Sequence, residues 1–251
     1  YIWDEENIYF TKLQAFILNP ILYLLRKIDI RQSKRPDFIV ANSFFVKDWI
    51  KKHYKIDCDV IYPPVDTKLF KLEKNKSGYY ITTARLEPYK RIDLIVDAFN
   101  NINEELYIVG DGSTKKSLKA KANENIKFYD FLDAVSVMNL VSKAKAFIHA
   151  GIEDFGIAPV EAQSCGTPVI AFNKGGVSET VVNGKTGVLF EYQTAGAILD
   201  AIKRFNKIKF NYRLISEHAA NYSEEKFISN VKKYVESKLH NLKDNNEKEK
   251  G

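Results

Sequence analysis

The sequence predicts an α/β fold whose largest part is a doubly wound parallel sheet, and three observations support this. From residue 79 onward one unit repeats: a short apolar run rich in β-branched residues, a turn, and a helical pattern. The apolar runs are hydrophobic at successive positions, which is typical of strands buried on both faces. Parallel neighbours need a crossover, and a helical pattern lies between successive runs. The chain has 251 residues, enough for one large or two modest domains.

The first part of the chain contains one markedly apolar run, AFILNPILYLL at 15–25. It is too short to span a bilayer, and Pro20 interrupts it. We interpret it as a helix of the core or of a domain contact. A helix lying on a membrane surface is the alternative, which Arg26 and Lys27 favour. The chain starts at Tyr1 without an initiator methionine or a signal-peptide pattern, so we expect it to be a piece of a longer protein.

A strand, a helix and a proline-containing connection are predicted next. DFIVANS at 37–43 indicates a buried strand, and FFVKDWIKKHY at 44–54 indicates the helix after it. Pro63 and Pro64 forbid a helix and stiffen a crossing segment. We therefore place an interdomain linker at residues 63–76.

The repeating part supplies the remaining elements. The predicted strands are 79–84, 105–110, 126–131, 144–150, 167–172 and 187–190. The predicted helices between them are 91–102, 114–123, 134–144, 158–166 and 177–184. After residue 206 the pattern is mostly helical over 207–240, and the polar tail 241–251 is expected to be disordered.

Composition excludes several classes of protein. The net charge is +6, but the lysines are scattered and no basic–aromatic motif appears, so no nucleic-acid partner is predicted. Cys58 and Cys165 lie far apart and offer neither a disulfide framework nor metal-ligand spacing. The four histidines are equally dispersed. The sequence therefore predicts no metal centre and is consistent with a reducing cytoplasm.

Polar and glycine residues follow several predicted strands, where ligands of an open parallel sheet bind. Gly110, Gly156 and Gly175 allow left-handed backbone and close approach by a ligand. Helix N-termini at the same edge favour anions. These positions predict a ligand site at the carboxyl edge of the sheet.

Arg85 and Lys90 lie five residues apart in the turn TARLEPYKRID after the first strand of the repeating part. A guanidinium fork and an ammonium group that converge there suit a diphosphate. On spacing alone, two solvated bases in local salt bridges explain them at least as well.

Two acids surround the next glycine turn, in EDFGIAPVEA. Glu161 is expected in the first turn of a helix that tolerates Pro159, and favourable interaction with the helix dipole alone could explain it. Glu153, beside Asp154 in a loop, is harder to explain as a cap. Carboxylates accept hydrogen bonds from vicinal hydroxyls, so acids and phosphate-binding bases together point to a nucleotide sugar.

Taken together, ARLEPYKRID, YIVGDG, EDFGIAPVEAQSCGTPVIAFNKGG and VNGKTGVLF resemble the donor domain of glycosyltransferase family 4, the group 1 glycosyltransferases. The resemblance covers about residues 36–205 and includes mannosyltransferase-like members. It implies the GT-B type of α/β fold, with a complete Rossmann-like donor domain at 77–206. Residues 1–62 would then be the remnant of a first, acceptor domain.

The resemblance also implies roles for individual residues. Arg85, Lys90 and Glu153 would form the catalytic set, with the two bases on the diphosphate and Glu153 at the transferred sugar. Glu161 would bind the ribose hydroxyls. The implied donor-binding set is Arg85, Lys90, Gly110, Glu153, Phe155, Gly156, Ile157 and Glu161.

The family implies retention of anomeric configuration without a metal or another cofactor. DCD at 57–59 imitates a metal-binding D-x-D motif, but its place before the linker favours coincidence. Asp133 and Ser178 depart from the family pattern at positions where glycine and proline are common. A catalytic-cleft histidine of the first domain has no counterpart, and His53 does not fit that context.

The sequence thus predicts a retaining hexosyltransferase that uses a nucleoside diphosphate sugar, with GDP-mannose as the candidate donor. The acceptor would be lipid-linked or a polysaccharide, and the location cytoplasmic or peripheral at the inner face of the membrane. The alternative is a catalytically incomplete nucleotide-sugar-binding subunit that needs a separate acceptor domain. An epimerase or phosphorylase of the same fold lacks an identifiable catalytic residue here. A nicotinamide dehydrogenase is disfavoured because no G-x-G-x-x-G follows the first strand of the repeating part.

Overall fold

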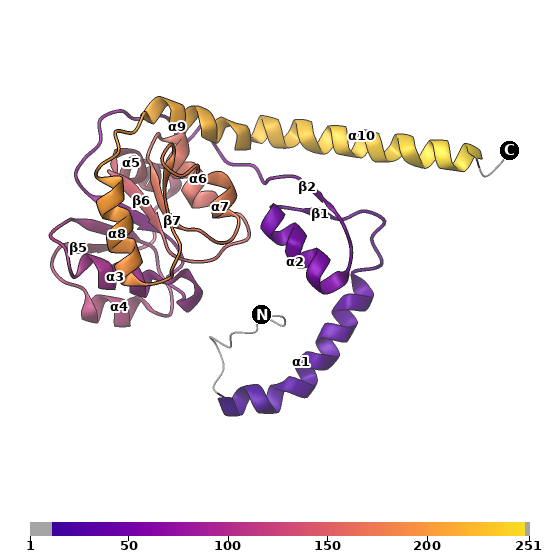
Figure 1. The fold of residues 1–251 in the computed structure, drawn as a ribbon, viewed down its shortest axis with the longest axis horizontal. Helices are drawn as coiled ribbons and strands as arrows, with labels where there is room; N and C mark the ends of the chain where they lie inside the picture. The colour runs from indigo at the N-terminus through magenta and orange to yellow at the C-terminus, as the bar shows by residue number, and fades with distance from the viewer. Residues whose placement is uncertain (1–11, 249–251) are drawn as a thin grey trace.

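The computed structural model describes residues 12–248 of the chain, with the side chains of residues 18–240. Its largest part is a six-stranded parallel sheet in the order β5-β4-β3-β6-β7-β8 (Figure 1). Counted from β3, this is the 3-2-1-4-5-6 order of a doubly wound sheet, so the predicted α/β fold class is confirmed. The strands are β3 (Tyr80–Thr83), β4 (Leu106–Val109), β5 (Ile126–Tyr129), β6 (Ala146–His149), β7 (Val169–Phe172) and β8 (Gly187–Phe190).

Helices cover both faces of this sheet because its strands are apolar at successive positions. Tyr80 points into one core cluster and Ile81 into another, as the two-residue period of a strand requires. The first cluster joins the sheet to α3 (Ile92–Phe99), α4 (Lys115–Lys121) and α8 (Ala195–Phe205). The second joins it to α5 (Ala134–Lys143), α6 (Ile157–Ser164) and α7 (Val177–Thr180). We call residues 77–206 the six-stranded domain.

A smaller unit precedes it. In this unit β1 (Val40–Ala41) and β2 (Asp59–Val60) form a two-stranded parallel sheet beside α2 (Phe44–Tyr54). The helix has the predicted bounds, because the Ser43 side chain caps its first turn and Lys55 ends it in a left-handed conformation. The predicted strand 37–43 is shortened to two residues, and β2 lies in a stretch for which no strand was predicted. The helix, the sheet and the adjoining residues up to 62 are called the α2–β2 unit below.

Helix α1 (Lys12–Gln32) corrects the interpretation of the first apolar run. The helix continues through Pro20, whose missing N–H removes one backbone bond without ending it. Among its described side chains, none of the apolar ones is buried as a core or domain-contact helix requires, and Tyr23 and Leu24 are 59% and 58% exposed. None of the helices in the described part of the chain combines the length and apolarity that a membrane crossing demands.

Residues 63–76 are attached to the six-stranded domain and to the C-terminal helices. The Val65 amide donates to the Tyr222 carbonyl at 2.9 Å, next to the short helix η2 (Ala220–Tyr222). The Lys76 ammonium donates to the carbonyls of Ser142 and Cys165 and to the hydroxyl of Thr167. This predicted linker is therefore an ordered strap rather than a free connection.

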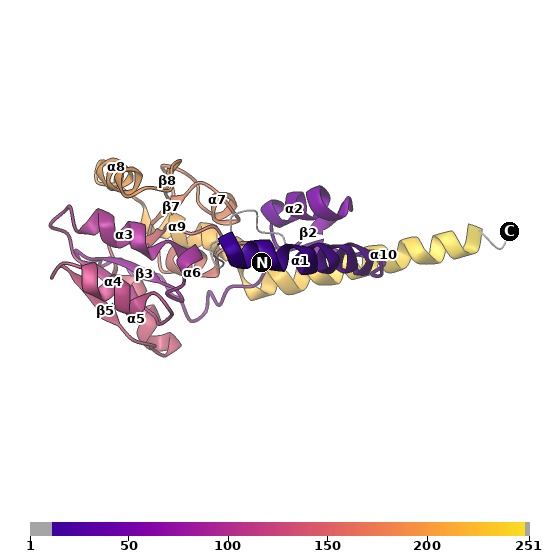
Figure 2. The same ribbon diagram turned by 90° about the horizontal axis from the view of Figure 1, so that it is seen from below.

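Two helices complete the chain, α9 (Tyr212–Ala219) and α10 (Glu224–Lys248). Helix α10 runs out from the six-stranded domain past the α2–β2 unit as a long straight arm (Figures 1 and 2). Lys238 on this arm pairs with Asp59 at 2.9 Å. Disorder was expected over 241–251, whereas the helix continues to Lys248, and residues 249–251 lie outside the described part of the chain. Asn, Lys and Glu in this stretch are polar but compatible with a solvated helix.

Candidate functional site

The predicted ligand edge lies where the strand order reverses. Strands β3 and β6 are parallel neighbours, so their carboxyl ends meet at one edge although 63 residues separate Lys90 from Glu153 in sequence. The loop after β3 carries Arg85 and the short helix η1 (Pro88–Lys90), and the loop after β6 leads into α6. An open α/β sheet binds its ligands at such a switch point.

Lys90 and Glu153 form an ion pair at this edge. The Lys90 ammonium lies 2.5 Å from a Glu153 carboxylate oxygen, and the two side chains are only 14% and 25% exposed. The ammonium also lies 5.0 Å from the centre of the Tyr89 ring. The structure thus brings together a predicted phosphate-binding base and a predicted sugar-binding acid, and each neutralises the other in a partly dehydrated place.

Arg85 lies on the same loop but is exposed. Its guanidinium donates to the Tyr89 hydroxyl at 3.0 Å, so Tyr89 contacts both predicted cations of the loop. An exposed guanidinium on this loop suits contact with an anion at the edge.

His149 is a site residue that the sequence interpretation missed. It ends β6, is only 7% exposed, and its Nε2 atom lies 3.9 Å from the Glu153 carboxylate. Within residues 18–240 no group hydrogen-bonds to that atom. Burial lowers the pKa of His149, which favours the neutral ring. A single polar residue at the end of the apolar run AKAFIHA was the signal that could have identified it.

Glu161 lies in the second turn of α6, not in the first turn as expected. The helix dipole therefore does not explain it, since that effect is confined to the first turn. Burial, with a smaller effect from the Asp66 carboxylate, raises the pKa of Glu161 to about 7. Among the side chains that the structure describes, none hydrogen-bonds to this carboxylate, which leaves its oxygens available to hydroxyl donors.

The turn from Phe155 to Ile157 joins the β6 loop to α6. Gly156 has φ +89°, a left-handed conformation that suits glycine, and it begins the helix without a side-chain cap. The ring of Phe155 packs away from solvent against Tyr62 and Tyr222, with both ring centres 5.6 Å away. The first amides of α6 are thus presented at the edge by a rigid turn.

Gly110 serves close packing of the backbone. A Cβ atom at this position would lie 1.9 Å from the Ala84 carbonyl oxygen, in the neighbouring loop after β3. Similarly, a Cβ on Gly176 would lie 2.3 Å from the Asp154 carbonyl oxygen. These contacts hold the loops after β3, β4, β6 and β7 together, while a direct contact of Gly110 with a donor stays a prediction.

The two departures from the family pattern have local explanations. The Asp133 carboxylate caps α5 by accepting from the amides of Val135 and Ser136. The Ser178 hydroxyl donates to the Gly175 carbonyl. Beside Asp133, Phe131 is 87% exposed after β5.

The carboxylates of the Asp57–Cys58–Asp59 segment form ion pairs outside this edge of the sheet. Asp57 pairs with Lys47 at 3.2 Å and Asp59 pairs with Lys238, so the two carboxylates have separate cationic partners. No group of three histidine, cysteine or acidic side chains with metal-binding geometry occurs among the described residues.

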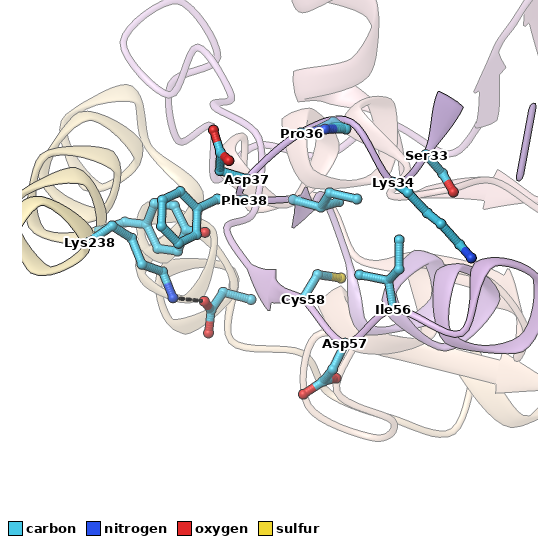
Figure 3. A pocket seen from close by; sticks show the side chains of 12 residues that line it. Ser33, Lys34, Pro36, Asp37, Phe38, Ile56, Asp57, Cys58 and Lys238 are labelled. Atoms are coloured by element: carbon cyan, nitrogen blue, oxygen red, sulfur yellow. Dashed lines mark hydrogen bonds and ion pairs between the residues drawn. The ribbon is translucent and has the colours of Figure 1, made fainter. Parts of the chain in front are cut away.

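A cavity of about 340 Å³ lies next to that segment, between the α2–β2 unit and α10 (Figure 3). Phe38 and Ile56 supply apolar walls, while Lys34 and the Lys238–Asp59 pair supply charges at the rim. It lies away from Lys90 and Glu153, so it is not part of the predicted donor site.

Curated relatives are glycosyltransferases. The chain is 27% identical to the O-antigen chain mannosyltransferase RfbU of Salmonella typhimurium over 222 residues, which covers 79% of this chain and 61% of that protein. It is 24% identical to an uncharacterized glycosyltransferase of Methanocaldococcus jannaschii over 80% of this chain and 59% of that protein. The chain thus spans about three fifths of the length of these relatives.

Solved structures show the same fold. HepE of Anabaena, in complex with UDP and glucose, superposes with a TM-score of 0.74 at 20% identity, over 84% of this chain and 66% of that chain. Sucrose-phosphate synthase of Thermosynechococcus elongatus gives a TM-score of 0.75 at 20% identity, over 87% of this chain and 62% of that chain. These likenesses place the chain in the GT-B type of fold. The chain belongs to the glycosyl transferases group 1 family, whose profile matches residues 65–233.

Proposed function

We propose that the carboxyl edge of the six-stranded sheet binds a nucleoside diphosphate sugar, and that the chain is the donor-binding part of a retaining hexosyltransferase. The Lys90–Glu153 pair at the switch point is the observation that carries this proposal. GDP-mannose is the candidate donor, since relatives include mannosyltransferases. The acceptor would be lipid-linked or a polysaccharide.

The ion pair suggests how the donor is received. Without a ligand, Lys90 and Glu153 neutralise each other. A diphosphate supplies stronger anionic partners for Lys90 and Arg85, and the released Glu153 carboxylate can accept hydrogen bonds from sugar hydroxyls. Binding of the two halves of one donor is therefore linked through this pair.

The same cations would act in the reaction. When the sugar–phosphate bond breaks, negative charge grows on the departing diphosphate. Lys90 and Arg85 would stabilise that charge, an electrostatic contribution of several kcal/mol in such sites. The first amides of α6, at Gly156 and Ile157, would hold the phosphates, and Glu161 would accept from the ribose hydroxyls. In this mechanism the substrate is activated without a metal.

Calorimetry with GDP-mannose and with GDP tests the assignments. Lys90→Ala should weaken binding of both ligands by roughly 10- to 100-fold, the value of a charged hydrogen bond. Glu161→Ala should also weaken both. Glu153→Ala should leave GDP binding intact, because Lys90 is then free, but abolish the preference for the sugar-bearing ligand. Lys203→Ala, an exposed lysine on α8, is the matched control. Wild-type affinity in the Lys90 and Glu161 variants would refute the site.

A second candidate is a donor-binding subunit that needs a separate acceptor domain. The exposed apolar side of α1 and the two-stranded sheet favour it, since such a sheet is marginal unless another layer covers it. Transfer of labelled mannose by the chain alone would favour the complete enzyme. Transfer only after a companion polypeptide is added would favour the subunit.

The proposed location is the cytoplasm, with peripheral contact to the inner face of the membrane. The basic residues Arg26, Lys27 and Arg31 beside the apolar side chains of α1 support such a contact. Flotation with anionic vesicles tests it, and an Arg26→Glu/Lys27→Glu protein should lose any binding. Failure of the wild-type protein to float would remove the membrane from the proposal.

A further inference from the structure

Glu179, on α7 of the six-stranded domain, contacts a distant part of the chain. Its two carboxylate oxygens accept hydrogen bonds from the backbone amides of Phe44 and Phe45, at 2.9 and 2.8 Å. These residues begin α2, more than 130 positions earlier in the sequence. Both views of the fold show α7 beside α2 (Figures 1 and 2).

The contact completes the cap of α2. The first amides of a helix have no partner within the helix, and a negative charge is favoured there by the helix dipole. In α2 the Ser43 hydroxyl accepts only from Val46, at 3.0 Å. The amides of Phe44 and Phe45 depend on Glu179, a residue of the other unit. These two amides are therefore capped only while α2 lies against α7.

The same carboxylate reaches the loop of the proposed donor site through one aromatic ring. The Tyr62 hydroxyl donates to Glu179 at 3.0 Å, and the Tyr62 ring packs on Phe155 with ring centres 5.6 Å apart. Tyr222 closes the group, 5.3 Å from Tyr62, and its hydroxyl donates to the Glu179 carbonyl at 3.4 Å. Phe155 lies two residues after Glu153.

We infer that Glu179 is a positioning residue that fixes the α2–β2 unit and the Glu153–Ile157 loop relative to each other. Without its carboxylate, the amides of Phe44 and Phe45 lose the acceptors that join α2 to α7, and water must replace them. Tyr62 would lose its acceptor at the same time, and Phe155 would lose a fixed packing partner. Ligand occupancy of the loop and the position of the α2–β2 unit are then coupled, in both directions. The coupling to a donor rests on the proposed function, but the positional role does not.

Hydrogen exchange on the ligand-free protein tests the positional role. In Glu179→Ala, exchange should become about tenfold faster both at the start of α2 and in the segment 153–157, because the two are released together. The exchange rates of Glu179→Gln should lie between those of the wild type and Glu179→Ala, since the glutamine oxygen still accepts hydrogen bonds but carries no charge. Glu191→Ala, an exposed acid whose contact is with Asn173 in the same domain, should exchange like the wild type.

Comparing exchange at the start of α2 with exchange in the segment 153–157 distinguishes a positioning role from a simple helix cap. Faster exchange at the start of α2 alone would make Glu179 a simple helix cap and overturn the inference, as would unchanged exchange in both segments. A second measurement is the affinity for GDP-mannose, expected to fall severalfold in Glu179→Ala and to recover in part in Glu179→Gln. If the wild type binds no nucleotide, the proposed function fails, and the exchange pattern still decides the role of Glu179.

Discussion

The six-stranded domain and the α2–β2 unit are both built from parallel strands and helices, yet they differ in what covers their apolar residues. In the domain, helices on both faces leave Phe99 and Phe147 completely buried. In the smaller unit, Phe38 and Val40 stay 44% and 40% exposed, because two short strands cannot bury two faces. The domain is therefore stable through its own core. The smaller unit contacts the rest of the chain through the Glu179 carboxylate and through the ring of Tyr62.

This difference explains why the proposed site lies in the six-stranded domain. Catalytic groups need fixed geometry, and the loops after β3 and β6 obtain it from a close-packed sheet beneath them. The smaller unit contributes no side chain to the Lys90–Glu153 pair. What it contributes is a surface beside the Glu153–Ile157 loop, through Tyr62, which contacts both Phe155 and Glu179.

The largest contrast should appear when a phenylalanine is removed from the domain core. Phe99→Ala creates a cavity against Tyr80, and it should lower the free energy of unfolding by about 3–5 kcal/mol. Denaturant unfolding followed by circular dichroism measures it. A loss below about 1 kcal/mol would mean that the core is less tightly packed than its complete burial indicates.

A pH-dependent effect should follow in Glu161→Gln. The pKa of Glu161 is raised from its usual 4.5 to about 7, so the folded state holds a proton that the unfolded state has lost. The wild type should therefore lose stability as the pH rises from about 4.5 through 7, by on the order of 3 kcal/mol. The glutamine variant lacks this loss. The difference in free energy of unfolding between the variant and the wild type should therefore shift in favour of the variant when the pH is raised from 4.5 to 8. Parallel unfolding curves at both pH values would contradict the desolvation of this carboxyl.

Lys76→Met should weaken the strap between the two regions. Methionine keeps most of the side-chain volume but leaves the carbonyls of Ser142 and Cys165 without their ammonium donor. We expect a loss of about 2 kcal/mol, measured by denaturant unfolding. Proteolysis should cut residues 63–76 faster than in the wild type. Unchanged stability and cleavage would show that the linker is held by packing of Val65 and Phe70 instead.

Phe38→Ala is the counterpart of Phe99→Ala, because it removes a phenylalanine side chain from the exposed α2–β2 unit and not from the domain core. Its loss should not exceed about 0.5 kcal/mol, the usual range for a surface position. Thermal unfolding next to Phe99→Ala measures the difference between the two regions directly. A loss similar to that of Phe99→Ala would mean that Phe38 is covered in solution.

Much of the fold could be predicted from local pattern. The apolar runs gave the six strands of the domain to within three residues at each end, and the helical period gave α2 its bounds. The motifs around Arg85, Lys90, Glu153 and Glu161 were sufficient to identify the family. Local pattern works here because a strand or helix is specified by the spacing of apolar residues and by its caps.

Other features were decided only by the tertiary structure. The exposure of α1 could not be predicted, because an apolar run shows what would be buried and not whether a partner is present. The pairing of Lys90 with Glu153 and the cap that Glu179 provides for α2 join residues far apart in sequence. The order of the strands in the sheet decides which loops meet. A local pattern that repeats every two or four residues carries no information about contacts between residues sixty or more positions apart.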